Sequence, residues 1–289
     1  MKSLLIFVAT MAITAALTAA TPDQLFAAGR AALADNDLAK AVDLLEQAVK
    51  AKPNDAQYHY FLGQAYGREA MSASIFGKAG FAGKSKAELL RAVELDPNYL
   101  DSRFGLLEFY LQAPGIVGGS DEKAVEQAQE IRKRDPLMGH NAFARIYTKE
   151  KKPELARKEH YDAIREQPNS AKAHQALGVY LMLEKDYKDA LAEYETALKL
   201  DGAYMPAYFQ IGHTAALAST NFVRGEEALK KYLAYKPLEN EPSLSRAWFW
   251  LGRIYEAQGR KADAKQSYTT SLKLNAAQKD VADALKHVS

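Results

Sequence analysis

The stretch QAPGIVGGSDEKA, residues 112–124, is where the chain comes nearest to a phosphate-binding loop, because three glycines precede a lysine. In such a loop Lys-Ser or Lys-Thr directly follows the last glycine, and backbone N–H groups surround the anion. Here Lys123 stands four residues beyond the last glycine, behind Asp121 and Glu122, whose charges would repel a phosphate. The same residues suit a helix start, with Ser120 as N-cap and two acids in the first turn. We therefore interpret the stretch as a turn between helices.

No other pattern selects a catalytic or metal site. Ser120 is not the nucleophile of a Gly-x-Ser-x-Gly elbow, because Glu122 occupies the position of the second glycine. The six histidines include no His-x-His and no His-Glu-x-x-His spacing, and the chain has no cysteine for thiol catalysis or a thiolate metal site. Carboxylates are abundant, but nothing in their spacing selects an acid–base pair. We expect no enzyme activity, no cofactor and no metal ion.

The first twenty residues, MKSLLIFVATMAITAALTAA, have the layout of a secretory signal. Lys2 precedes an uncharged apolar run, and small residues close the segment, which predicts cleavage after Ala20. A retained membrane anchor is the alternative, although the threonines and alanines make the run weakly apolar. Cleavage would give a periplasmic or secreted protein with no stable membrane insertion.

Composition limits the partners of the mature chain. Without Lys2, 37 basic residues face 36 acidic ones, and this balance argues against a nucleic-acid binder, which usually has a basic excess. The absence of cysteine means that burial of apolar groups, rather than disulfides, must stabilise an exported fold.

Two segments reveal an internal repeat: residues 173–202 and 247–276 share small and aromatic residues at the same spacings. Each has a glycine after a large apolar residue, an alanine twelve positions later and a tyrosine four beyond that, as in Gly178, Ala190 and Tyr194. Offsets of three and four place residues on one helical face, so each unit predicts two helices.

These residues resemble the tetratricopeptide repeat (TPR), a helix-turn-helix unit of about 34 residues. The resemblance extends over residues 22–276 and gives seven units. Their signature small residues are Gly29, Gly63, Gly105, Ala144, Gly178, Gly212 and Gly252. Residues 277–288, with Val281, Leu285 and Val288 at helical spacing, predict a capping helix. The expected fold is an all-α TPR superhelix.

Two units carry extra residues between their helices, at about 71–86 and 113–120. We expect residues 71–88 to form a loop that packs on the flank of the stack, or a flap that lines a ligand pocket. His160 falls at the aromatic position of a second helix, which predicts a packed core histidine.

The resemblance implies that the first helix of each unit lines a concave groove, through residues six and three before the signature residue and one and four after it. For the third unit, counting from Gly105, these are Tyr99, Ser102, Leu106 and Phe109. Among all groove positions five are Arg or Lys and two are acidic. The candidate partner-binding residues are Arg30, Tyr60, Gln64, Asn141, Arg145, Lys172, Gln175, Phe209, His213, Arg246, Phe249 and Arg253.

Such a groove predicts a non-catalytic scaffold that binds an extended peptide or protein partner with acidic side chains or a free C-terminal carboxylate. The alternative is a soluble carrier of a small anionic or apolar ligand, enclosed by the concave side.

Overall fold

The computed structural model describes residues 20–238 and 241–288, and all of its regular elements are helical. The predicted secretory signal lies outside these residues except for Ala20. The elements are α1 (Pro22–Ala34), α2 (Leu38–Ala51), α3 (Ala56–Ser72), α4 (Ile75–Leu95), α5 (Leu100–Gln112), the short 3-10 helix η1 (Gly115–Val117), α6 (Asp121–Arg134), α7 (Pro136–Lys149), α8 (Pro153–Glu166), α9 (Ala171–Leu183), α10 (Tyr187–Leu200), α11 (Met205–Ala218), α12 (Phe222–Leu233), α13 (Leu244–Ala257), α14 (Lys261–Leu274) and α15 (Lys279–Val288).

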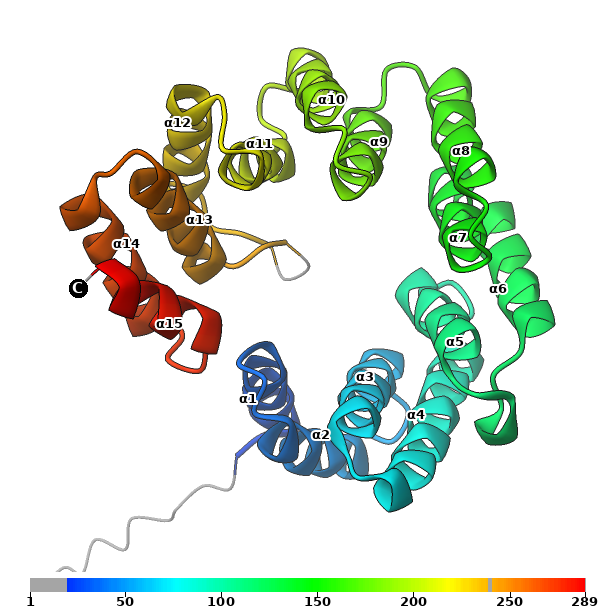
Figure 1. Ribbon diagram of the computed structural model, residues 1–289. Helices are drawn as coiled ribbons and strands as arrows, with labels where there is room; N and C mark the ends of the chain where they lie inside the picture. Colours follow the sequence, from blue (N-terminus) through cyan, green and yellow to red (C-terminus); the bar gives the residue numbers. More distant parts are fainter. Residues whose placement is uncertain (1–19, 239–240, 289) are drawn as a thin grey trace, which may run out of the picture.

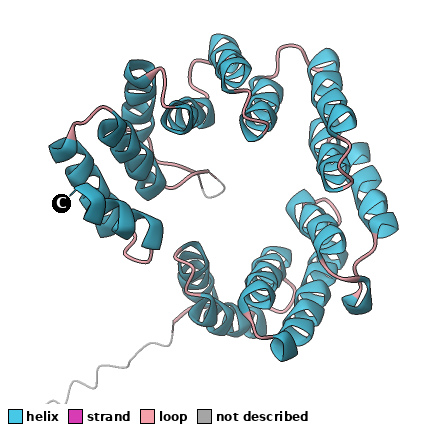
Figure 2. Ribbon diagram, in the orientation of Figure 1, coloured by secondary structure: helices cyan, strands magenta, loops and turns pink. Residues whose placement is uncertain are grey.

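Consecutive helices pair into seven hairpins, from α1–α2 to α13–α14, and α15 packs on the last of them. Figure 1 shows the hairpins arranged around an open ring, and Figure 2 shows that only loops connect them. The first helix of each hairpin (the inner helices α1, α3, α5, α7, α9, α11 and α13) faces the inside of the ring, and the second (the outer helices) lies outside. The predicted all-α fold of seven hairpins and a capping helix is confirmed.

Helix boundaries follow from local capping. Thr21 and Gln24 form a capping box at the start of α1, and serines accept backbone N–H groups at the starts of α9 and α13. At the far end of the stack α15 buries Val281 and Val288 and packs Leu285 against the core, as expected of a cap. Of the helices described, none combines the length and the apolar character needed to cross a membrane.

Each hairpin is held by a close crossing of its two helices. A Cβ atom added to Gly178 would lie 2.4 Å from the ring of Tyr194, and one added to Gly252 would lie 2.5 Å from the ring of Tyr268. Gly212 has the same relation to a leucine of α12, at 2.2 Å. Tyr194 and Tyr268 are fully buried. The glycines therefore occupy equivalent sites, where a missing side chain admits a large residue of the outer helix of the same hairpin.

The third hairpin departs from the predicted register. A Cβ atom on Gly105 would meet Leu89 and Tyr60 of the preceding hairpin, at 2.9 and 3.3 Å, rather than the outer helix α6. Arg103 donates through Nε to the carbonyl of Pro97, six residues earlier, at 2.9 Å. In the second and fifth hairpins a histidine four residues before the signature glycine makes the equivalent bond.

Leu107, four residues after Arg103, therefore stands where the other hairpins have glycine or, in the fourth, Ala144. The assignment of Gly105 to this position is wrong by two residues. The physical reason is that the large side chain at this crossing lies on the inner helix and the small one on the outer helix, the reverse of the other hairpins. Leu107 is fully buried, and the aromatic position of α6 is filled by the small Ala128, which is also fully buried.

The expectation of a loop or flap at residues 71–88 is wrong, because these residues continue helices. They lengthen α3 to Ser72 and begin α4 at Ile75, with a break of two residues between them. Phe81 packs against the buried core of the first two hairpins, with its ring centre 6.2 Å from that of Tyr66, while Met71 is exposed.

The extra residues of the third hairpin form a turn. Gly118 has φ of 98°, in the left-handed region that favours glycine, and Ser120 accepts the N–H of Lys123 at 3.2 Å. The geometry is that of a helix-capping turn.

The sequence pattern did not predict an additional long link, which lies between the sixth and seventh hairpins. The link between α12 and α13 is longer than the other links between hairpins, and Figure 1 shows its described residues, 234–238 and 241–243, on the inner side of the ring. Pro237 and Pro242 interrupt helix formation there, and Tyr232 donates to the carbonyl of Pro242 at 2.6 Å. The signal was available: Gly212 and Gly252 are 40 residues apart instead of 34.

Gly178→Ala should destabilise the protein. Glycine-to-alanine changes inside helices usually stabilise by about 0.5–1 kcal/mol, but here the methyl group meets a buried ring, and overpacking typically costs about 1–3 kcal/mol. Urea unfolding measures the difference. Gly83→Ala in α4 is the matched control, because nothing lies within 4 Å of its added Cβ, and it should be stabilising. Equal effects of the two changes would contradict the crossing geometry.

Leu107→Ala should lower the free energy of unfolding by about 2–5 kcal/mol, as expected for a leucine truncated in a packed core. Gly105→Ala should stay within about 1 kcal/mol of wild type, because the added methyl meets the flexible end of a side chain and gains helix propensity. If Gly105→Ala destabilised the protein more than Leu107→Ala, then Gly105, and not Leu107, would occupy the helix crossing.

Candidate functional site

The inner helices form a wall facing the inside of the ring, and the corrected register changes its third unit. The earlier offsets named Tyr99, Ser102, Leu106 and Phe109, but Ser102 and Leu106 are completely buried. Counting from Leu107 instead gives Asp101, Phe104, Glu108 and Leu111. Two carboxylates therefore belong to the inner wall that the sequence reasoning had not placed there.

Glu108 neutralises one of the predicted binding cations. Arg145 donates to Glu108 through Nε at 2.5 Å and through Nη2 at 3.1 Å, which joins α7 to α5. This hydrogen bond to the carboxylate raises the pKa of Arg145, and partial burial opposes the rise. A bidentate pair of this kind holds both side chains in place. The inner wall is thus less cationic than the sequence reasoning implied.

Aromatic rings surround Arg30 at the N-terminal end of the wall. The guanidinium carbon lies 4.4 Å from the ring centre of Phe61 and 5.3 Å from that of Phe26. Tyr60 packs edge-to-face on Phe61 at 5.0 Å and on Tyr99 at 5.3 Å. The structure therefore brings two predicted residues, Arg30 and Tyr60, into one cluster.

Hydrogen bonding and burial fix the Tyr60 hydroxyl in this cluster. The amide of Gln64, a third predicted residue, donates to it at 2.5 Å. Burial, and then the negative charge of Asp101, raise the pKa of Tyr60 to about 12. The hydroxyl stays protonated at neutral pH and keeps its ability to donate a hydrogen bond.

The C-terminal end has a second cation–aromatic cluster. Arg246 lies 4.4 Å from the ring centre of Phe249 and pairs with Asp280 of the capping helix at 2.7 Å. Phe209 and Phe249 are each 5% exposed, so these two predicted residues mainly support the wall from within. Their contribution to a partner contact is small.

His213 stacks on Trp250 in this cluster, with ring centres 4.1 Å apart. Burial, and then the nearby Arg246, lower the pKa of His213 to about 4, so its ring is neutral at physiological pH. Trp250, half-buried on α13, was missed because its position is not among the implied offsets.

The remaining predicted residues lie between and beyond these clusters. Asn141 and Gln175 are half-buried on neighbouring inner helices, and Gln175 accepts a long hydrogen bond of 3.4 Å from Tyr204. Lys172 is exposed. Arg253 is also exposed and lies 3.8 Å from Glu256.

Charges of different units influence one another across the inner wall. Partial desolvation raises the pKa of the Asp101 carboxyl group, although the residue is exposed, and the positive charge of Lys172 opposes the shift. These residues belong to the third and fifth hairpins. Opposite charges therefore interact across the fourth hairpin.

The link between α12 and α13 adds to the inner surface. Leu238 is 63% exposed, and its backbone N–H donates to Glu241 at 2.8 Å. Burial, then Glu241, then Asp201 raise the pKa of Tyr204 to about 12, which places the carboxylate of Glu241 within electrostatic reach of α11.

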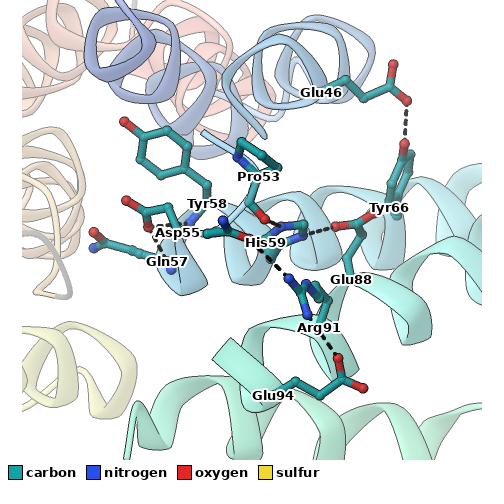
Figure 3. Close-up of polar contacts among 11 residues, drawn as sticks. Glu46, Pro53, Asp55, Gln57, Tyr58, His59, Tyr66, Glu88, Arg91 and Glu94 are labelled. Atoms are coloured by element: carbon teal, nitrogen blue, oxygen red, sulfur yellow. Dashed lines mark hydrogen bonds and ion pairs between the residues drawn. The ribbon is translucent and has the colours of Figure 1, made fainter. Parts of the chain in front are cut away.

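The histidines are less scattered than their sequence positions suggest. His59, His140 and His174 occupy equivalent positions on their inner helices, and each contacts a glutamate of the outer helix through Nδ1, at 2.5, 2.7 and 2.6 Å. Figure 3 shows His59 held between Glu88 and the Pro53 carbonyl. Across residues 20–238 and 241–288, no group of three His, Cys, Asp or Glu side chains could hold a metal ion.

Two surface hollows lie where inner helices turn into outer ones. One, of about 470 Å³, is lined by residues 221–224 with Glu227 and Gln258. The other, of about 350 Å³, is lined by Thr148, Lys151, Pro153, Tyr180 and Glu184. Neither is lined by any of the twelve candidate partner-binding residues.

Comparisons with known proteins agree with the repeat architecture. The tetratricopeptide repeat family pattern matches residues 26–68, 171–204 and 245–278. No match to this sequence is found among curated proteins. Similar solved structures include yeast Tom70, with 15% identity over 98% of this chain and 66% of that one, at a TM-score of 0.56.

Two further structures have the same overall arrangement. A tetratricopeptide repeat protein from Parabacteroides merdae has 14% identity over 92% of this chain and 98% of that one, at a TM-score of 0.51. The APC/C hetero-tetramer Cut9-Hcn1 has 14% identity over 92% of this chain, at a TM-score of 0.51, and the match spans only 48% of that chain. At these identities the likeness concerns the fold, which is a TPR superhelix as predicted.

His160 should make stability depend on pH. Burial, and then the charge of His140, lower its pKa to about 4, so the folded state keeps the ring neutral while the unfolded chain takes up a proton below about pH 6.5. The neutral His160 ring makes its full contribution to the free energy of unfolding above about pH 6.5, and this contribution decreases as the pH falls toward 4. Between pH 7 and pH 5 this amounts to about 2 kcal/mol.

His160→Phe removes that component and also removes a buried Nδ1 atom that has no hydrogen-bond partner. Urea unfolding at pH 7 and pH 5 should show that the free energy of unfolding decreases less in the variant than in wild type when the solution is acidified. A difference that does not change with pH would contradict the assignment.

Proposed function

We propose that this protein is a non-catalytic scaffold that binds an extended segment of a partner protein along its inner wall. The observation that carries the proposal is the arrangement of that wall: the inner helices pack on one another from α1 to α7 and again from α9 to α13, and they present half-buried aromatic and polar side chains to the inside of the ring. TPR proteins generally mediate protein–protein interactions. The hetero-tetramer Cut9-Hcn1, a similar structure, is itself a protein assembly.

The chemistry of the wall favours a partner segment with apolar side chains at two places. Aromatic rings cluster around Arg30 near the N-terminal end and around Trp250 near the C-terminal end. Between them lie amides and charges, which suit the backbone and polar side chains of an extended chain.

Fewer cations of the inner wall are available to attract an acidic partner than the count of Arg and Lys residues suggests. Because Arg145 and Arg246 already pair with carboxylates and Arg253 lies 3.8 Å from Glu256, attraction of an acidic group depends mainly on the exposed Lys172 and less on Arg253. The proposed partner therefore combines apolar anchors with an acidic side chain or a terminal carboxylate near one of these two residues.

We place this scaffold in the periplasm or outside the cell, on the basis of the secretory character of residues 1–20. The alternative, a carrier of a small ligand, needs an enclosing pocket. The two hollows described above lie at the turn edge of the stack, away from the candidate binding residues, and this observation favours the scaffold.

A photo-crosslinking amino acid placed at Gln175, on the inner helix α9, should capture a defined partner in envelope extract. The same group at Lys188, exposed on the outer helix α10, is the matched control and should not. Capture from both positions, or from neither, would contradict binding along the inner wall. Native mass spectrometry separates the carrier alternative, which predicts a retained small molecule and no stoichiometric protein.

Once a partner is captured, Lys172→Glu should weaken its binding by about tenfold, because reversing an exposed charge replaces an attraction of up to about 1 kcal/mol by a similar repulsion. The weakening should diminish at high salt. Lys188→Glu should leave affinity unchanged. Equal affinities of wild type and Lys172→Glu would remove the proposed role of this cation.

A further inference from the structure

The imidazole of His59 lies between two groups that only accept hydrogen bonds. Nδ1 is 2.5 Å from Oε2 of Glu88 on α4, and Nε2 is 2.9 Å from the carbonyl oxygen of Pro53. The ring is 7% exposed, so water contributes little. A neutral imidazole has one N–H group and can satisfy one of these acceptors, whereas the imidazolium ion satisfies both. The geometry therefore favours the protonated ring.

The two acceptors belong to different parts of the stack. Glu88 lies in the outer helix of the second hairpin, to which His59 itself belongs, while Pro53 lies in the link that leads from α2 of the first hairpin. Figure 3 shows the ring spanning the space between them. The side chain thus connects the second hairpin to the end of the first.

We propose that His59 is a proton-dependent joint that fixes the first hairpin to the rest of the superhelix. When the ring loses its proton, the remaining N–H group stays with the carboxylate, because a hydrogen bond to a charged group is the stronger one. The bond to the Pro53 carbonyl is then lost. Deprotonation loosens the link between hairpins while leaving the second hairpin intact.

The groups that face the ring support this assignment. Burial disfavours the charged ring, but the hydrogen bonds to Glu88 and Pro53 outweigh it and raise the pKa of His59, with Arg91 of α4 opposing them. A pKa above the ordinary value means that the joint stabilises the folded state fully below about pH 6.5. The stabilisation is lost as the pH rises through the folded-state pKa.

Other hairpins show the same joint with different chemistry. In the third, Arg103 donates to the Pro97 carbonyl at 2.9 Å and to Gln127 at 3.3 Å. In the sixth, the Tyr208 hydroxyl donates to the Gly202 carbonyl at 3.1 Å. The guanidinium of Arg103 keeps its charge near neutral pH, so this joint does not depend on pH there. In the fifth, His174 has the geometry of His59, with Glu193 at 2.6 Å and the Pro168 carbonyl at 3.3 Å.

The consequence concerns one end of the inner wall. The first hairpin carries Phe26 and Arg30, which pack on Tyr58 and Phe61 of the second. These contacts persist when the joint opens, so the hairpin loosens rather than unfolds. The inference does not depend on the proposed partner binding, because it concerns the stack itself.

Hydrogen–deuterium exchange of the full mature chain between pH 5.5 and 8.5, corrected for intrinsic exchange rates, tests the joint. In wild type the opening equilibrium of residues 22–51 should increase by about tenfold as the pH rises, the equivalent of one hydrogen bond to a charged group. Residues 244–274 are the internal reference, because their hairpin has Trp248 at the equivalent position.

His59→Arg copies the non-titrating joint of Arg103 and should make the protection of residues 22–51 independent of pH. His59→Phe should give residues 22–51, at every pH, the raised opening equilibrium that wild type reaches only at high pH. If the pH profile of residues 22–51 is the same in wild type and His59→Arg, the proposal is wrong. Circular dichroism checks that both variants fold.

A second test keeps His59 unchanged. The pKa of its ring is measured by NMR in wild type and in Glu88→Gln. The wild-type midpoint should lie above 6.5, the ordinary value for histidine, and loss of the carboxylate charge should lower it. The pH at which residues 22–51 open should fall with it. A midpoint at or below the ordinary value in wild type, or no shift in Glu88→Gln, would overturn the proposal.

Discussion

The whole superhelix depends on how closely the two helices of each hairpin cross. Where Gly178, Gly212 and Gly252 lie, the absence of a side chain lets a buried tyrosine or leucine of the outer helix rest against the inner helix. In the third hairpin the volumes are reversed, with Leu107 on the inner helix and Ala128 on the outer helix, both fully buried. The constraint is therefore the summed volume at the crossing, and the identity of each residue is secondary.

A second position, four residues before the crossing, determines how consecutive hairpins are joined. His59, Arg103, His174 and Tyr208 each reach back to a carbonyl in the preceding link. These carbonyls lie just beyond a helix end, where backbone acceptors lack intrahelical partners. Because Arg103 donates as a guanidinium and His59 as an imidazole, the same backbone geometry gives joints with different responses to pH. A sequence comparison alone would class these residues as unrelated.

Charge on the inner wall is more balanced than its count of cations suggests. Arg145 is occupied by Glu108 and Arg246 by Asp280, so the two arginines stiffen the wall between units and at its C-terminal end. Arg253 lies 3.8 Å from Glu256, so the exposed Lys172 remains the main source of attraction for an acidic group. Aromatic clusters at both ends, together with the inward segment before α13, determine the shape that a partner would meet.

The sequence by itself determined the helical class, the number of hairpins, the cap and the turn at residues 112–124, because these depend on short-range spacing, capping residues and proline. It did not determine the register of the third hairpin, since Gly105 offered a false signature and the compensating pair Leu107 and Ala128 lies across an insertion of unknown length. It also could not show that residues 71–88 extend two helices, or that the described residues of the link before α13, 234–238 and 241–243, lie on the inner side of the ring. Ion pairs such as Arg145 with Glu108 join residues 37 positions apart, so only the tertiary structure could decide which cations remain available.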